Sequence, residues 1–415
     1  MKFPFKLPML LDGATATNLM AMGMPSGVCV EKWICDHPSP FQQLQSEFIK
    51  AGSEAVYAPT FGATRLHLAE ADLGDQVETI NRQLVELSKS VAKPAGVLVG
   101  GNLSPSGLFV APYGDADFDD IYDLYREQVR ALDEAGVDFI IIETQTSLAD
   151  MRAAVLASRA TDLPVFVTIT VDPSGHTLTG GSLLPTILTL QAMDVDAIGL
   201  NCSSGPKEME PLIADIMHHT TVPIIAKPNA GIPMYNAEGS AEGYLSPREF
   251  AEEMERLLDA GASIIGGCCG TTPAHIMELN KMLESRTIQV DRERPDERAV
   301  DCYAATIETE AFFLSDNMVF SEPIECSPGL ADDLIDLDDE RVNIALVEIH
   351  SIDDARLLAE TGHMSRLPIA VQAETLPILE AALRYFQGRL IVSSDCSLER
   401  EHMEPIAAKY GAILY

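Results

Sequence analysis

Two adjacent cysteines set among glycines are the residues with the clearest chemical potential in this sequence. They lie in the stretch Gly266-Gly267-Cys268-Cys269-Gly270, directly after an apolar run. Successive side chains of a strand point to opposite faces, so neighbouring thiols can reach one ligand only where the backbone leaves the pleat, which glycine permits. A third cysteine, Cys202, directly follows another apolar run, 197–201. Three thiolates with one open position predict a reactive zinc site.

The donor set also indicates the kind of reaction. Zinc with three thiolate ligands carries a net charge of about −1, so it activates water poorly compared with zinc held by neutral histidines. A substrate thiol in the fourth position would lose its proton and stay nucleophilic, which favours alkyl transfer to sulfur. Soft thiolates select zinc over magnesium or calcium. The alternative interpretation is that Cys268 and Cys269 are small buried residues of a tight turn.

The other cysteines and the histidines lack such a setting. We expect structural roles for the remaining five cysteines, which are Cys29, Cys35, Cys302, Cys326 and Cys396. Histidines such as His275, His218 and His219 lie in helical patterns, and we predict none as a ligand. A metal hydrolase would need histidine or carboxylate ligands and a base at strand ends. The nine histidines mostly fall elsewhere, so this class of enzyme is disfavoured.

Short apolar runs that alternate with amphipathic helical patterns must position these residues. The predicted strands are 9–12, 55–59, 97–101, 139–143, 165–170, 197–201, 224–227 and 263–267. Helical patterns include 118–135, 148–159, 207–218 and 247–258, and several end in Ala-Gly just before a strand. Eight such βα units predict a (β/α)8 TIM barrel of the α/β class.

The notable polar residues fall at the carboxyl ends of the predicted strands, where such barrels carry their active sites. They are Asp12, Asn102, Glu143, Cys202, Asn229 and the pair Cys268-Cys269. Glu143 could hold a substrate ammonium group or form a salt bridge to a neighbouring loop. Asp12 could instead cap the following helix. Strands six and eight lie two apart around the barrel, so the three cysteines are predicted to be neighbours.

The amino-acid composition argues against some classes of binding partner and indicates the cellular compartment. The 415 residues carry a formal net charge of −35, which argues against nucleic acid and anionic membranes. No apolar run approaches the roughly 20 residues of a membrane span, and prolines interrupt the start of the chain where a signal peptide would be apolar. We therefore expect a cytoplasmic protein with free thiols.

A charged, proline-containing segment divides the chain. We predict a barrel domain over residues 1–287, a linker over 288–300 and a smaller α/β domain over 301–415. In the smaller domain, strands are predicted at 342–349, 368–372, 390–394 and 412–415, helices at 352–360, 376–386 and 399–410, and a further strand at 317–324. Its apolar last strand would leave an edge that something must cover.

At these residues the chain resembles the homocysteine S-methyltransferase family. The motifs are Leu11-Asp12-Gly13-Ala14, Thr60-Phe61-Gly62-Ala63, Ile142-Glu143-Thr144, Gly199-Leu200-Asn201-Cys202, Lys227-Pro228-Asn229-Ala230-Gly231 and the stretch from Gly266 to Pro273. The resemblance implies a zinc-dependent methyltransferase in which Cys202, Cys268 and Cys269 bind zinc. It further implies that Asp12, Gly13, Thr60 and Glu143 help to hold homocysteine, with Asn229 beside the metal.

The segment 301–415 resembles the first half of the pterin-binding barrel of cobalamin-dependent methionine synthases. Gln372 and Ser393 stand where that family has Asp and Asn, so we expect docking or self-association, a homodimer included, and no use of folate. A half sheet folded back on the first barrel is the alternative. For the methyl donor we favour a separate corrinoid protein over S-methylmethionine, S-adenosylmethionine or a betaine-like compound. A non-catalytic, partner-dependent zinc subunit of such a system is the alternative function.

Overall fold

The structure is a computed structural model of the chain. It describes residues 3–231, 234–235, 241–242, 244–286, 303–315, 317–337 and 341–415. The predicted linker 288–300 and Cys302 lie outside the described residues. Among the described residues, no helix is long and apolar enough to cross a membrane.

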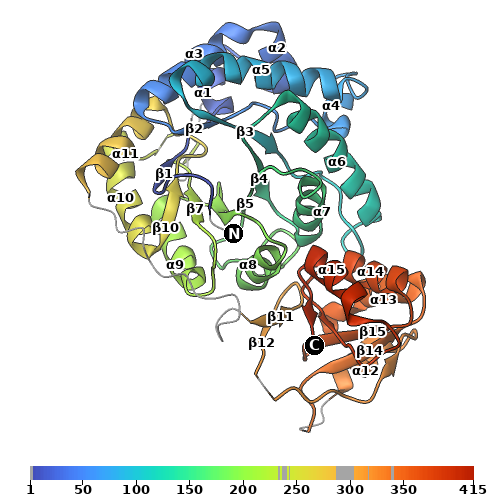
Figure 1. Cartoon of the computed structure of the whole chain (residues 1–415). Coiled ribbons are helices and arrows are strands. Elements are labelled where there is room, and N and C mark those ends of the chain that lie inside the picture. Colours follow the sequence, from blue (N-terminus) through green and yellow to red (C-terminus); the bar gives the residue numbers. More distant parts are fainter. Residues whose placement is uncertain are drawn as a thin grey trace.

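The first part of the chain is a barrel of eight parallel strands (Figure 1), which confirms the predicted fold class. The strands are β1 (Met9–Leu10), β2 (Ala55–Tyr57), β3 (Leu98–Leu103), β4 (Phe139–Gln145), β5 (Val165–Ile169), β6 (Ala197–Asn201), β7 (Ile224–Lys227) and β10 (Ala262–Ile265). Each overlaps one predicted run, and the ends agree to within two residues. The sheet order β1-β10-β7-β6-β5-β4-β3-β2 closes where Glu54 N donates to Leu10 O over 2.7 Å.

Eleven helices of the described residues surround or flank this barrel. They are α1 (Ala16–Ala21), α2 (Val30–Asp36), α3 (Pro38–Ala51), α4 (Arg65–Ala69), α5 (Val77–Ala95), α6 (Phe118–Ala135), α7 (Leu148–Ser158), α8 (Leu183–Ala192), α9 (Pro206–Met217), α10 (Pro247–Ala260) and α11 (Pro273–Ser285). The Ala-Gly helix ends behave as predicted, since Gly52 and Gly136 follow α3 and α6 with φ of 114° and 74°. A short pair, β8 (Met234–Tyr235) and β9 (Ala241–Glu242), follows β7.

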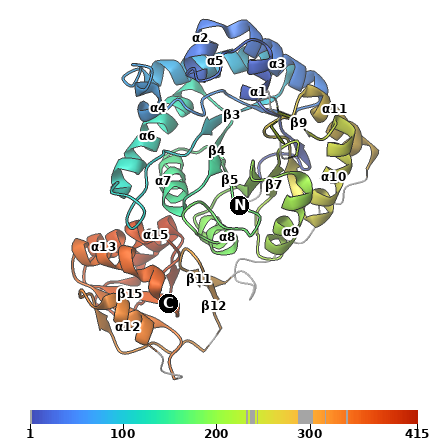
Figure 2. The same cartoon turned by 180° about the vertical axis from the view of Figure 1, so that it is seen from behind.

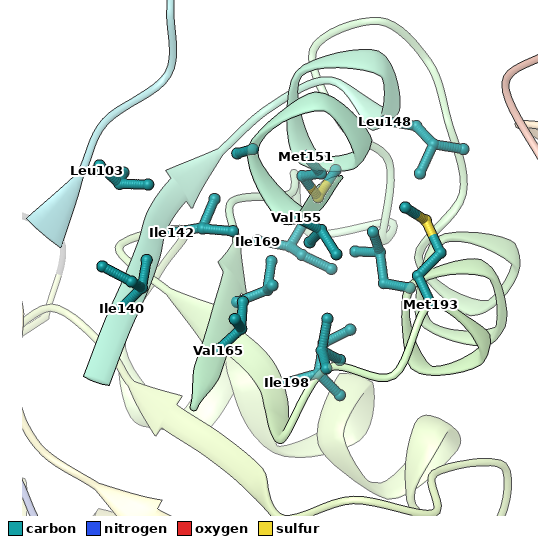
Figure 3. Close-up of a cluster of buried hydrophobic side chains, with 14 of the residues drawn as sticks. Leu103, Ile140, Ile142, Leu148, Met151, Val155, Val165, Ile169, Met193 and Ile198 are labelled. Atoms are coloured by element: carbon teal, nitrogen blue, oxygen red, sulfur yellow. The ribbon is translucent and has the colours of Figure 1, made fainter. Parts of the chain in front are cut away.

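Alternation along the strands divides the barrel core into two layers. Inward residues such as Tyr57, Phe139 and Phe166 fill the interior, and Phe3 and Phe5 pack against them where the N-terminus enters the barrel. Outward residues of β4, β5 and β6 pack against α7 and α8, as Figure 3 shows. The same alternation places Glu143, Asn201 and Lys227 on the inward face at the strand ends.

A second, smaller α/β domain lies beside α7 and α8 (Figure 2). A hairpin of β11 (Ala304–Thr306) and β12 (Ala311–Phe313) precedes a parallel sheet of β13 (Ile324–Glu325), β14 (Ala345–Ile349), β15 (Ile369–Ala373), β16 (Ile391–Val392) and β17 (Ile413–Leu414). Its helices are α12 (Leu330–Asp336), α13 (Ile352–Thr361), α14 (Leu376–Tyr385) and α15 (Arg400–Tyr410), with a 3-10 turn at Gly362–Met364. The four predicted strands and three predicted helices are present.

Two features of this domain differ from the sequence prediction. The hairpin was not predicted, because strands of three residues carry too little alternation to be read. The predicted strand at 317–324 is wrong for most of its length, since β13 begins at Ile324 and Phe320 makes only an isolated bridge to Ile344.

Gln372, near the end of β15, uses its side chain within the second domain. Its amide nitrogen donates to Asp395 O over 2.6 Å.

The two faces of the second sheet are covered in different ways. Helix α14 contacts both α13 and α15, and the three helices lie together beside the sheet (Figure 1). The opposite face, with Leu346, Ala370 and Ile391, packs against Ala305 and Leu314 of the preceding segment. Tyr303, Met318 and Phe320 extend this cover, which consists of the described residues between 303 and 320. The chain therefore shields this apolar surface itself.

The second domain docks on the barrel through a buried arginine. Arg152, in the middle of α7, is fully buried, and its guanidinium donates to Leu383 O and Arg384 O over 2.6 and 3.1 Å. These carbonyls end α14, and a helix C-terminus favours a cation. Arg384 pairs in turn with Asp119 of α6. Because α7 lies between barrel and second domain, it is buried on every side.

Candidate metal and substrate site

The three predicted ligand cysteines meet at the carboxyl ends of β6 and β10. Their sulfur atoms all lie within 4.8 Å of one another, and Cys202 Sγ is 3.9 Å from Cys269 Sγ. Tetrahedral zinc with bonds of about 2.3 Å would place its sulfur ligands about 3.8 Å apart. The donor type and spacing therefore fit zinc, and within the described residues this is the one metal-sized cluster of His, Cys, Asp or Glu.

Hydrogen bonds hold the turn that carries Cys202. This residue has φ of 61°, a left-handed conformation that costs a non-glycine residue energy. Its N–H donates to Lys227 O over 3.2 Å, and its carbonyl accepts from the amide of Asn229. Asn229 Oδ1 accepts from Cys269 N over 3.1 Å, so one side chain ties both cysteine loops together. Asn229 thus lies beside the cluster, as predicted.

The sulfur atoms also set one another's ionisation. Contacts with Cys202 and Cys268 lower the pKa of Cys269, while contacts with Cys268 and Cys269, together with burial, raise the pKa of Cys202. Asn201, inward at the end of β6, points its amide nitrogen at Cys268 Sγ from 3.9 Å and donates to Thr144 Oγ1 over 2.7 Å. A thiolate cluster at this position is therefore supported by donors from neighbouring strands.

Beside the cysteines, a buried lysine bridges the two predicted carboxylates. Lys227 Nζ lies 3.1 Å from Asp12 Oδ1 and 3.2 Å from Glu143 Oε1, and its side chain is only 5% exposed. It also lies 4.0 Å from the centre of the Tyr57 ring. Burial by itself would lower the pKa of Lys227, but the charges of Asp12 and Glu143 outweigh it and raise that pKa.

The positions of Asp12 and Glu143 disagree with the two alternative roles considered for them, which were helix capping and a salt bridge to a neighbouring loop. Asp12 does not cap a helix, because its Oδ2 accepts from Tyr57 N over 2.8 Å and its Oδ1 faces Lys227. Burial raises the pKa of Asp12 although Lys227 opposes the shift. Glu143 pairs with an inward lysine of a strand, and Asn102 donates to its Oε2 over 2.7 Å. Lys227 was not predicted as a site residue, although it lies two residues after the inward Ile225 on the same strand, and this alternation indicates an inward side chain.

Thr60 and Gly13 support the site from behind. Thr60 is fully buried, and its hydroxyl accepts from Asn102 N and donates to Asn102 O, so its contacts hold Asn102 in place. A Cβ on Gly13 would lie 2.8 Å from both the Phe48 ring and Thr271 Oγ1. Only glycine fits there, because Thr271 Oγ1 must also reach Ala14 N and Cys268 O.

A buried acid behind the loop after β3 should give the stability a specific pH dependence. Burial raises the pKa of Asp150 from 3.8 to about 6, although Tyr125 OH and Ser106 N donate to it over 2.8 and 2.9 Å. Because the folded state holds this proton more tightly than the unfolded chain, stability falls as pH rises from about 4 to about 6, by roughly 3 kcal/mol.

Urea unfolding between pH 4 and pH 7 tests this expectation with Asp150→Asn, which has no charge to bury. The difference in unfolding free energy between variant and parent should change across that window in the variant's favour as pH rises. Asp120→Asn, at an exposed position of α6, is the control and should leave the profile unchanged. An unaltered profile in Asp150→Asn would contradict the assignment.

Comparison with known proteins now identifies the class to which this barrel and site belong. A family model described as homocysteine S-methyltransferase matches residues 9–283. The chain therefore belongs to the homocysteine S-methyltransferase family. The predicted family resemblance is confirmed.

Two methionine synthases are among the proteins to which this chain is similar. The methionine synthase of Mycobacterium tuberculosis (strain ATCC 25618 / H37Rv) is 32% identical over 289 residues, which is 65% of this chain and 24% of that protein. The methionine synthase of Mycobacterium leprae (strain TN) is 27% identical over 396 residues, 86% of this chain and 32% of that protein. The chain thus spans a third or less of the length of these relatives.

Solved structures agree on the fold. The metallated form of the homocysteine methyltransferase MmuM from Escherichia coli has 25% identity and a TM-score of 0.56, and the match covers 66% of this chain and 95% of that one. The oxidized form has 24% identity, a TM-score of 0.58 and the same coverage, and supports the barrel fold alone.

Proposed function

We propose that this chain transfers a methyl group to the thiol of homocysteine, with zinc held by Cys202, Cys268 and Cys269. The observation that carries the proposal is the convergence of three sulfur atoms within 4.8 Å beside a buried pair of carboxylates. Zinc bound there would favour the thiolate form of the substrate and leave its sulfur nucleophilic. In the reaction the sulfur–carbon bond forms, the thiol proton is released, and the donor's leaving group departs with its electron pair.

The chain's own residues orient the amino acid in this proposal. Glu143 accepts the substrate ammonium, and Asn102 and Lys227 fix the carboxylate that receives it. Asp12 balances the Lys227 charge from the other side and keeps the lysine in place. Asn229 and Asn201 hold the cysteine turns in the geometry that one metal ion requires.

A titration with homocysteine tests this assignment. A zinc site with an open position should bind homocysteine at about one equivalent per chain and release about one proton near neutral pH, as calorimetry in buffers of different ionisation enthalpy measures. X-ray absorption at the zinc edge should then show a fourth sulfur neighbour. Binding without proton release and with an unchanged zinc environment would indicate the alternative, a non-catalytic zinc subunit.

For the methyl donor we propose a corrinoid protein on a separate chain. The proposal draws on the similarity to methionine synthases and on the family's methyl transfer to sulfur. Full-length protein should turn over homocysteine with a methylated corrinoid protein and remain inactive with S-methylmethionine, S-adenosylmethionine or a betaine alone. Turnover with S-methylmethionine in the absence of corrinoid protein would overturn the choice of donor while leaving the acceptor assignment intact.

A further inference from the structure

The loop that follows β5, residues 170–182, begins beside the Cys202 turn. Thr170 Oγ1 donates to Asn201 O over 3.1 Å, and Val171 N donates to Ser203 Oγ over 3.0 Å. Asn201 and Ser203 are the two chain neighbours of Cys202. The first residues of the loop therefore help to hold the strained turn that carries one of the three sulfur atoms.

The far end of the same loop is bound by the second domain. Glu308, which follows β11 in the hairpin, accepts a hydrogen bond from Thr179 Oγ1 over 2.8 Å through its buried side chain. Its carbonyl accepts from Ser182 N over 3.0 Å, and Thr309 O accepts from Ser182 Oγ over 2.8 Å. A Cβ on Gly181 would lie 2.9 Å from Glu308 Cγ, so the loop and the hairpin pack closely.

The hairpin is itself fixed at its base. Thr306 Oγ1 lies 2.7 Å from Thr189 Oγ1 of α8, within a buried contact. Thr306 also exchanges backbone hydrogen bonds with Arg389, which precedes β16, over 3.0 Å in each direction. The hairpin therefore spans from the second sheet to the loop at the mouth of the barrel, and both of its ends are anchored.

We propose that this hairpin clamps the 170–182 loop and through it stabilises the Cys202 turn, so that the second domain takes part in forming the methyltransferase site. Glu308 acts here as a positioning residue, since it touches the loop and none of the sulfur atoms. The inference extends the proposed function, and its effect on zinc rests on that function. Its effect on the loop does not.

Hydrogen–deuterium exchange on the full chain tests the clamp. Glu308→Ala should increase deuterium uptake at short times in peptides covering 171–182 and 202–205, because it removes the only buried carboxylate contact of Thr179 among the described residues. Thr179→Val removes the same hydrogen bond from the other side and should reproduce the effect, and the double variant should add nothing. Glu310→Ala, an exposed carboxylate two residues along the hairpin, is the matched control.

Zinc release to a chelator provides the second measurement. Groups bonded directly to metal ligands typically change metal affinity 10- to 100-fold, and Glu308 acts through the loop, so zinc loss from Glu308→Ala should be faster by less than about 10-fold, with Glu310→Ala unchanged. Increased uptake confined to 303–313, or spread equally over α6 and α7, would overturn the proposal. If the parent chain binds no zinc, the proposed function fails, while exchange in the loop still decides the clamp.

Discussion

Replacing Cys202, Cys268 and Cys269 together by alanine should reduce bound zinc from about one ion per chain to none and abolish methyl transfer to homocysteine. The three sulfur atoms supply every ligand that the described site offers within 4.8 Å, so the triple variant retains no soft donor there. Zinc held by such ligands is worth on the order of 10 kcal/mol or more in binding free energy. Metal analysis after gel filtration measures the loss directly.

A matched control comes from cysteines elsewhere in the chain. Cys29 and Cys326 are half-buried free thiols, and burial raises the pKa of each. Their alanine variants should keep the full zinc content and the parent's affinity for homocysteine. Zinc retained by the triple variant, or lost from the control variants, would remove the basis of the proposed site.

The second large effect is expected at Lys227. Lys227→Met should lower the unfolding free energy by about 3–5 kcal/mol, because it leaves two buried carboxylates, Asp12 and Glu143, without their counter-charge. Methionine keeps much of the length and volume, so packing changes little. Urea unfolding at neutral pH measures the loss, and Lys50→Met, at an exposed position in α3, serves as control.

A double variant distinguishes the ion-pair explanation from a packing defect. Asp12→Asn combined with Lys227→Met removes one buried charge of each sign, so it should be less destabilised than the sum of the single variants. If the Lys227→Met variant folds, its Michaelis constant for homocysteine should rise more than its turnover number falls, since Lys227 orients Glu143. Strictly additive losses of unfolding free energy would show that Asp12, Glu143 and Lys227 are not energetically coupled.

Much of the barrel could be predicted because its strands are buried on both faces. Such strands form short apolar runs, and the runs 139–143 and 197–201 correspond to β4, which continues to Gln145, and to β6. The strand ends then placed the three cysteines together, because parallel strands bring their carboxyl ends to one edge of the barrel. The same strand ends included Asn229, and the family resemblance implied that it lies beside the metal; the structure places it between the cysteine loops.

The network around Lys227 was not predicted, and docking of the second domain on the barrel was considered only as an alternative, without the residues that form it. A lysine at a strand end is usually solvent-exposed, and only its alternation with Ile225 indicates the interior. Docking depends on contacts more than 200 residues apart in sequence, such as Arg152 with Leu383, which no local pattern encodes. The available signal in the sequence was that 148–158 has no polar face, since Asp150 and Arg152 are its only charged residues, whereas an outer barrel helix normally keeps one polar face.

One face of the second sheet, with Leu346, Ala370 and Ile391, is covered by the chain itself, and this cover limits what else can bind there. The segment between 303 and 320 is joined to the sheet by the same chain, so its effective concentration at that face is on the order of millimolar or higher. Any added strands that would close the sheet into a barrel must displace this tethered competitor from Leu346, Ala370 and Ile391. Only a partner that binds more favourably than the tethered segment could occupy the face, and a second copy of the sheet would have to displace two such segments at once.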